Sequence, residues 1–156
     1  MNESRRTTLQ VAGGAGLYAA LVSIGMLRPG TASAQAFDRA AFQAKGFADA
    51  LAALGASGVG ESGQITIVSP DIAENGAVVP VGIRSGLPNT QTMALLVEQN
   101  PNALAASYEI LDGALPEVTM RIKMGQSSDV LALVKADGKF YTARKEIKVT
   151  LGGCGG

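Results

Sequence analysis

The chain of 156 residues has no histidine, no tryptophan and only one cysteine. Without histidine there is no imidazole to act as a general base or metal ligand, and the cysteine lacks the partner that activates a protease-type nucleophile. No phosphate-binding loop or nucleophile elbow occurs, and no G-x-G-x-x-G turn follows a predicted strand. These absences disfavour an enzyme that acts alone, and we expect neither a cofactor nor a metal.

The chain has no excess of charge of either sign, because thirteen basic residues balance thirteen acidic ones. No basic run is interleaved with aromatic residues, so nucleic-acid binding is not expected. Only three Tyr and four Phe are present, while 47% of the residues are hydrophobic. The length suits one domain whose core is built mainly from Val, Ile, Leu and Ala.

The N-terminus has the order of an export signal: the paired Arg5 and Arg6, an apolar run over residues 11–27, and then small residues. The apolar run contains four glycines and is only mildly hydrophobic, which favours a twin-arginine (Tat) signal over a Sec signal. A membrane helix retained in the mature chain is the alternative. We expect cleavage after Ala34, with Ala36 as second choice, so that no membrane segment remains.

The residues around the arginines resemble the Tat motif, although Thr8 replaces the usual Phe and Gln10 the usual Lys. Cleavage after Ala34 removes three arginines and one glutamate and leaves a net charge of −2. The mature chain is therefore expected in a bacterial periplasm. A cysteine there is usually paired, and this one has no partner within the chain.

The rest of the chain predicts one helix followed by short strands. Residues 37–54 place apolar side chains on one arc at 100° per residue, and Gly55 is expected to end the helix. Phe42 breaks this pattern and is expected to contact something outside the core. Seven strands are predicted, over residues 64–68, 78–83, 92–98, 107–111, 118–124, 130–135 and 140–151.

Turn signals separate these strands, and Asp137-Gly138 is the strongest hairpin signal among them. In residues 117–124 apolar and polar side chains alternate strictly, as in a strand with one buried face. No βαβ alternation occurs, which argues against a parallel sheet. We therefore predict an all-β, immunoglobulin-like β-sandwich with an N-terminal helix.

The last predicted strand leads directly into "GGCGG". Its alternation places Ile147, Val149 and Leu151 towards the core, so Leu151 is expected to root a flexible arm. The predicted organisation is a cleaved signal peptide (1–34), a sandwich domain (35–151) and a carrier arm (152–156).

Two polar clusters are weaker site candidates. Asp71, Glu74 and Asn75 offer oxygen ligands for Ca²⁺, but they lack regular ligand spacing, and turn and capping polarity is the favoured interpretation. Three basic residues of the last strand are interpreted as its solvated face, with positive potential for a nearby anionic group as the alternative. They are Arg144, Lys145 and Lys148.

Cys154 lies between two pairs of glycine, Gly152-Gly153 and Gly155-Gly156. The glycines have no Cβ, so the backbone can enter a narrow channel. Five residues reach about 17 Å, so the thiol can visit active sites on other proteins while its own domain stays outside. Neither a prenylation box nor a lipoprotein box fits the position of the cysteine. The tail is thus either a thiol carrier or a disordered segment whose thiol dimerises or does nothing.

Several stretches of the chain are similar to one known family. They are the Tat leader, "DALAALGA", "PDIAENGAVVPV", "LLVEQNPNALAASYEI", "RIKMGQSSDVLALVKADGKFYTAR" and the highly specific terminal "KEIKVTLGGCGG". Together they resemble the SoxY family of the bacterial thiosulfate-oxidising (Sox) system, and the likeness covers essentially the whole chain.

The resemblance implies that Cys154 is a covalent sulfur carrier. In that family a haem-containing enzyme pair couples thiosulfate oxidatively to the thiol, a hydrolase releases sulfate, and a sulfane dehydrogenase, where present, oxidises the remaining sulfur. The carrier forms a heterodimer with a SoxZ-type subunit, for which Phe42 and the aliphatic strands are candidate contacts. Two other classes remain: a non-catalytic binding or structural sandwich whose tail forms an intermolecular disulfide, and a thiol enzyme.

Overall fold

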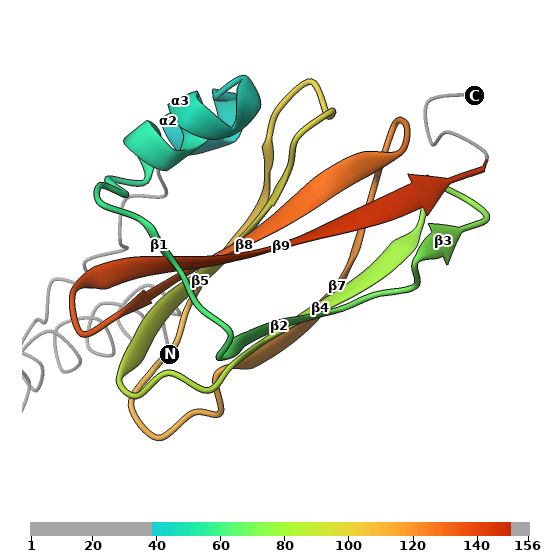
Figure 1. Ribbon diagram of the computed structural model, residues 1–156. Helices are drawn as coiled ribbons and strands as arrows, with labels where there is room; N and C mark the ends of the chain where they lie inside the picture. Colours follow the sequence, from blue (N-terminus) through green and yellow to red (C-terminus); the bar gives the residue numbers. More distant parts are fainter. Residues whose placement is uncertain (1–38, 151–156) are drawn as a thin grey trace, which may run out of the picture. The chain divides into compact units, whose positions relative to one another are not determined.

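The computed structural model describes residues 39–150, which form two β-sheets with two short helices against the larger one (Figure 1). The helices are α2 (Arg39–Gln43) and α3 (Gly46–Ala53). The strands are β1 (Gly60–Glu61), β2 (Ile65–Val68), β3 (Ile72–Ala73), β4 (Val79–Ser85), β5 (Thr90–Val97), β6 (Leu104–Glu109), β7 (Glu117–Ile122), β8 (Ser128–Ala136) and β9 (Lys139–Val149). The predicted all-β, immunoglobulin-like sandwich is confirmed.

The larger sheet has the order β1-β9-β8-β5-β6, with β3 also paired to β9, and the smaller sheet has the order β2-β4-β7. All pairs are antiparallel except that β1 and β3 each run parallel to β9 over two residues. The sequence argued against a parallel sheet, and parallel pairing is indeed confined to these two short contacts at the edge of the larger sheet. Two-residue strands have no periodic pattern, so the sequence could not have revealed them.

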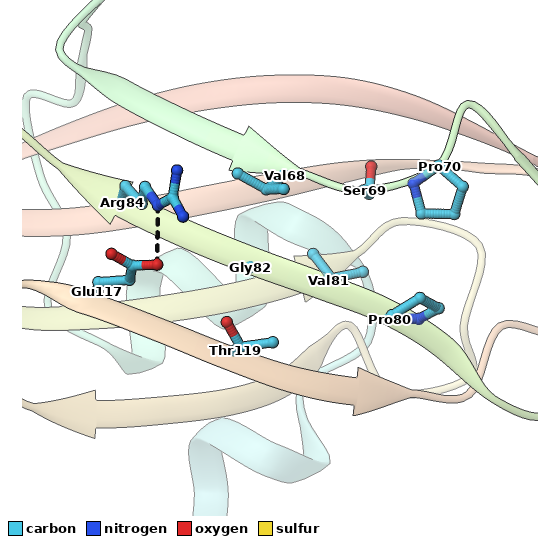
Figure 2. Close-up of a pocket in the computed structure, with 9 residues that line it drawn as sticks. All are labelled: Val68, Ser69, Pro70, Pro80, Val81, Gly82, Arg84, Glu117 and Thr119. Atoms are coloured by element: carbon cyan, nitrogen blue, oxygen red, sulfur yellow. Dashed lines mark ion pairs between the residues drawn. The ribbon is translucent and has the colours of Figure 1, made fainter.

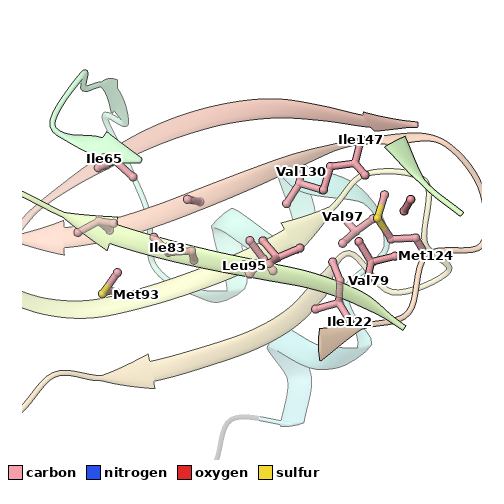
Figure 3. Packing of buried hydrophobic residues seen from close by; sticks show 14 residues of the cluster. Ile65, Val79, Ile83, Met93, Leu95, Val97, Ile122, Met124, Val130 and Ile147 are labelled. Carbon is pink, nitrogen blue, oxygen red and sulfur yellow. The ribbon is translucent and has the colours of Figure 1, made fainter. Parts of the chain in front are cut away.

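The core lies in two layers because β5 and β8 are buried on both faces. In β5, Met93, Leu95 and Val97 point between the sheets, where all three are fully buried (Figure 3). Ala94 and Leu96 point the opposite way and pack beneath the helices. Successive side chains of a strand face opposite sides, so one apolar run serves both layers.

The single helix predicted over 37–54 is wrong, since the described part of that range is broken into α2 and α3. Gly46, at which α3 begins, has φ of +80°, so a continuous right-handed helix cannot pass through it, and the Ala44 carbonyl accepts a hydrogen bond from Ala103 N–H at 3.2 Å. The break therefore ties the helices to the β5–β6 loop. Gly55, with φ of +68°, follows the end of α3 as predicted.

Despite the break, the buried helix face keeps most of the predicted apolar arc, including Ala41 and Ala44. Phe47, Ala50, Leu51 and Leu54 pack onto the sheet at the i, i+3, i+4, i+7 spacing, whereas Ala48 of the predicted arc is exposed. Phe42 is half-buried against the same cluster, so part of its ring belongs to the core, and its expected contact outside the core stays a prediction.

The seven predicted strands all occur, and six lie within two residues of their predicted bounds. The exception in placement is β6, which begins at Leu104 rather than Ser107 and ends at Glu109. Leu104 pairs with Leu96 and is buried with it under the helices, so this packing outweighs the weak strand preference of the neighbouring alanines. In β7 the alternation of residues 117–122 is confirmed.

The predicted Asp137-Gly138 hairpin is confirmed between β8 and β9, with φ of 49° and 73° at its two residues. A Cβ added at Gly138 would meet nothing within 4 Å, so a substitution there acts only through the backbone. We expect Gly138→Ala to lower the free energy of unfolding by about 1–2 kcal/mol. Gly63→Ala, at a position equally open but without positive φ, should change it by less than about 0.5 kcal/mol in the same urea titration. Equal effects would contradict this explanation.

Candidate functional site: the end of strand β9

The described structure stops four residues before the predicted carrier cysteine. Cys154 and the arm glycines Gly152, Gly153, Gly155 and Gly156 lie outside the described residues, as do Leu151 and the signal-motif residues Arg5 and Arg6. The same holds for the predicted signal peptide, residues 1–34. The structure does describe the strand that leads to the arm, and the surroundings of its last residues define the candidate site.

Strand β9 runs from the Asp137-Gly138 turn to Val149 and presents its two faces to different layers. Ile147 is fully buried between the sheets, and Val149 packs half-buried against the same core. Lys148 and Thr150 are exposed, so the predicted alternation of the final strand is confirmed as far as Thr150. The chain therefore reaches the arm from a strand anchored in the core.

The short strand β3 lies beside the end of β9 (Figure 1). Lys148 N–H donates to the Asp71 carbonyl at 2.9 Å, and Thr150 N–H donates to the Ala73 carbonyl at 3.0 Å. Ala73 is buried in the core between the sheets, which fixes β3 in place. The end of β9 is thus hydrogen-bonded to a segment about 75 residues earlier in the sequence.

Lys145 makes a second tie to the segment before β3. Its Nζ donates to the Ser69 carbonyl at 2.7 Å and forms an ion pair with Asp71 Oδ1 at 3.0 Å. Because the Asp71 side chain is 87% exposed, the ion pair itself contributes little stability, and the bond to the partly buried carbonyl is the stronger constraint. Lys145 therefore belongs neither to a freely solvated face nor to an unpaired positive site.

The other two basic candidates, Arg144 and Lys148, differ in their contacts. Arg144 pairs with Asp129 at 3.0 Å and lies 5.3 Å from the Phe47 ring centroid, so it joins β9 to β8 and to α3. Lys148 is exposed and forms no ion pair within residues 39–150. Of the three basic residues, only Lys148 retains a solvated ammonium beside the end of β9.

The acidic cluster is a turn, as favoured from the sequence. The Asn75 side-chain oxygen accepts a hydrogen bond from Ala77 N–H at 2.8 Å, and its carbonyl accepts one from Val78 N–H at 3.3 Å. Asp71 pairs with Lys145, and the Glu74 carbonyl accepts a hydrogen bond from the Thr150 hydroxyl. Within the described part of the chain, no three His, Cys, Asp or Glu residues lie close enough to hold a metal ion.

A shallow cavity of about 230 Å³ lies on the outer face of the smaller sheet (Figure 2). Its floor is at Gly82, where the absent side chain leaves space beside Val68 and Thr119. The Arg84–Glu117 ion pair, at 2.8 Å, closes one side. The lining is otherwise apolar or uncharged and has no nucleophile paired with a base, so this cavity supports binding rather than catalysis.

Sequence reasoning missed the residues that hold the end of β9. Ser127 contacts Val149 and Thr150 contacts Glu74, but serine and threonine near a strand end carry no pattern that points to a partner 22 or 76 residues away. Among residues 39–150, neither helix is long and apolar enough to cross a membrane. The described site therefore consists of a strand end and its ties, with the predicted reactive group beyond it.

Comparison with known proteins finds a matching family and a similar solved structure that agrees with it. The model of the family described as "Sulfur oxidation protein SoxY" matches residues 50–154. The solved structure of the sulfur carrier protein SoxY from Chlorobium limicola f thiosulfatophilum is similar to this chain, with 37% sequence identity and a TM-score of 0.61. The match covers 65% of this chain and 89% of that one.

A second solved structure, the superoxide reductase (neelaredoxin) from Ignicoccus hospitalis, has 22% identity and a TM-score of 0.51. The match covers 57% of this chain and 82% of that one, and at this identity it shows a shared fold alone. No curated protein matches the chain significantly.

Proposed function

The chain belongs to the SoxY family of sulfur oxidation proteins, and we propose that it is a periplasmic sulfur carrier of thiosulfate oxidation. In this proposal Cys154 binds the sulfur intermediates covalently and presents them to the enzymes of the pathway. The carrier performs no catalysis itself. The arm of residues 152–156 moves the bound sulfur between active sites, while the sandwich serves as the scaffold.

One observation carries the proposal: the family match ends at residue 154, so it contains the only cysteine of the chain. The similar Chlorobium protein is described as a sulfur carrier. A sulfur atom is the natural attachment point for sulfur cargo, because a thiolate exchanges with other sulfur centres by direct attack. The absence of histidine in the chain agrees with a carrier whose chemistry is supplied by partner enzymes.

The proposed cycle adds thiosulfate to Cys154 and releases its sulfur in steps. The Cys154 thiol and thiosulfate form a sulfur–sulfur bond, giving Cys–S–S–SO₃⁻, one proton and two electrons, which pass to the haem-containing coupling enzyme. Water then attacks the terminal sulfonate sulfur, which leaves a persulfide on Cys154 and releases sulfate and a proton. Where a sulfane dehydrogenase is present, the persulfide and three waters give Cys–S–SO₃⁻, seven protons and six electrons, which pass to that enzyme. A further water then attacks the sulfonate sulfur, which releases sulfate and a proton and restores the thiol.

We test the attachment site by incubating the full chain with thiosulfate and an extract of thiosulfate-oxidising cells. The proposal expects a reductant-sensitive adduct on the C-terminal peptide that contains Cys154, detected by fragmentation mass spectrometry. The alternative, a structural sandwich with a tail disulfide, expects a covalent complex with another protein on a non-reducing gel. That complex, without any thiosulfate adduct, would refute the carrier proposal.

The proposed partner is a SoxZ-type subunit in a heterodimer. Phe42 can offer only part of its ring to the partner, because the ring is half-buried against the protein's own core. The large hydrophobic side chains that the described surface does expose include Leu111 and Leu115, in the β6–β7 connection at the end of the sandwich opposite the end of β9 (Figure 1). These side chains are better candidates than the predicted one for contact with a subunit.

Export is proposed to follow the Tat route, with the partner carried along in the folded complex. Replacing Arg5 and Arg6 by lysine should therefore keep both this chain and the SoxZ-type subunit in the cytoplasm. Immunoblots of periplasmic and cytoplasmic fractions measure this, and a lysine substitution at Arg28 is the matched control. Independent appearance of the partner in the periplasm would contradict the joint export.

A further inference from the structure

The end of β9 extends beyond β8, the antiparallel strand that pairs with most of its length. Strand β8 begins at Ser128, which is paired with Ile147, so Lys148, Val149 and Thr150 have no β8 residue opposite them. Unpaired residues at a strand end fray, and the arm would then begin earlier in the chain. Groups outside β8 form the backbone hydrogen bonds of these three residues instead.

Ser127 takes the place of β8 on one side. Its hydroxyl oxygen accepts a hydrogen bond from Val149 N–H at 2.9 Å, and the hydroxyl lies 3.5 Å from the Val149 carbonyl. A serine side chain that meets both backbone groups of one residue copies the pairing that a further strand residue would provide. Val149 is therefore held although the ladder to β8 has ended.

Strand β3 and Thr150 hold the other side. The two backbone bonds to Asp71 and Ala73 continue the ladder to Thr150, and the Thr150 hydroxyl donates to the Glu74 carbonyl at 3.0 Å. The segment that receives these bonds is itself fixed, by Lys145 at its start and by the Asn75 turn at its end. Each backbone N–H from Lys148 to Thr150 thus has an acceptor.

We infer that Ser127, Thr150 and β3 form a clamp that fixes Thr150 and thereby sets the length of the arm carrying Cys154. The inference rests on the proposed carrier function, in which the depth that the thiol reaches in a partner enzyme matters. Cys154 is four residues beyond Thr150, which limits its reach from that point to about 14 Å. Release of Lys148–Thr150 would extend the limit to about 25 Å.

The reach of the arm can be measured without thiosulfate or a partner enzyme. The unique thiol is labelled with biotin maleimides of increasing spacer length, and capture by streptavidin, whose biotin site is recessed, is timed for the full chain. We expect the shortest spacer to be captured roughly ten-fold more slowly than the longest one in the wild type. In Ser127→Ala/Thr150→Val the difference should shrink to about three-fold or less, because the longer arm replaces the missing spacer.

Hydrogen exchange and a matched control separate the clamp from general destabilisation. The amides of Lys148, Val149 and Thr150 should be protected in the wild type. In the double variant Val149 should lose protection, because its acceptor is gone, and Lys148 and Thr150, held by β3 alone, should exchange faster, while the amides in the middle of β8 stay protected. Ser107→Ala/Thr119→Val makes the same chemical changes at exposed sites of β6 and β7 and should leave both readouts unchanged.

Three results would overturn the clamp: unprotected wild-type amides, an unchanged exchange rate of Val149 in the double variant, or faster exchange with an unchanged spacer dependence. The outcome is distinguishable from that of the carrier proposal, because the streptavidin measurement needs only the thiol. A chain that never binds sulfur could still show the clamp, and a sulfur carrier could lack it.

Discussion

Replacement of Cys154 by serine is expected to reduce thiosulfate oxidation to the background of a strain lacking this protein. Serine keeps the shape of the side chain but cannot form the sulfur–sulfur bond on which the proposed cycle depends. The chain has no second cysteine to compensate. Thiosulfate consumption by cells carrying only the variant measures the effect, and immunoblotting confirms that the protein accumulates normally.

A relocated thiol tests whether the arm is required as well as the sulfur atom. Val78 is 52% exposed on the turn that follows β3, so Val78→Cys in the Cys154→Ser background places a thiol at the same end of the sandwich without the arm. This variant should remain inactive with the partner enzymes, although small thiol reagents modify it. Full activity of either variant would refute the carrier proposal.

Leu95→Ala is expected to lower the free energy of unfolding by about 2–5 kcal/mol. Leu95 is fully buried in β5, an inner strand of the larger sheet, where it packs between the two sheets (Figure 3). Truncation removes buried apolar surface and leaves a cavity that the sheets on both sides cannot easily close. Urea unfolding of the full chain, followed by circular dichroism, measures the change.

Leu115→Ala is the matched control for this truncation. Leu115 is 83% exposed in the β6–β7 connection, so the same substitution should change the free energy of unfolding by less than about 0.5 kcal/mol. Comparable losses at the two positions would mean that the described core does not determine stability. A loss at Leu115 only in the presence of a SoxZ-type subunit would instead locate the partner contact.

The sandwich could be predicted because its signals are local. Alternation over residues 117–124 and the Asp137-Gly138 turn each specify a conformation within a few residues, and both are confirmed. The helix break at Gly46 could not be predicted in the same way. It depends on the Ala44 carbonyl meeting Ala103 in a distant loop, a contact that helical periodicity does not report.

The candidate site also combines a local feature that the sequence reveals with long-range contacts that it does not. "GGCGG" is contiguous, so its composition alone predicted an arm with a thiol. The ties that hold the end of β9 come from Ser127 and from residues 69–75, and their register follows from the packing of β3 rather than from any motif. For the same reason Lys145, interpreted from the sequence as a solvated side chain, proved to be bonded to the Ser69 carbonyl.

The most direct test of the carrier proposal is the intact mass of the wild-type protein isolated, without reductant, from cells growing on thiosulfate. The proposal predicts a population heavier by sulfane or thiosulfonate groups, which reductant removes and which Cys154→Ser lacks. An unmodified thiol as the sole species, in cells that are actively oxidising thiosulfate, would contradict it.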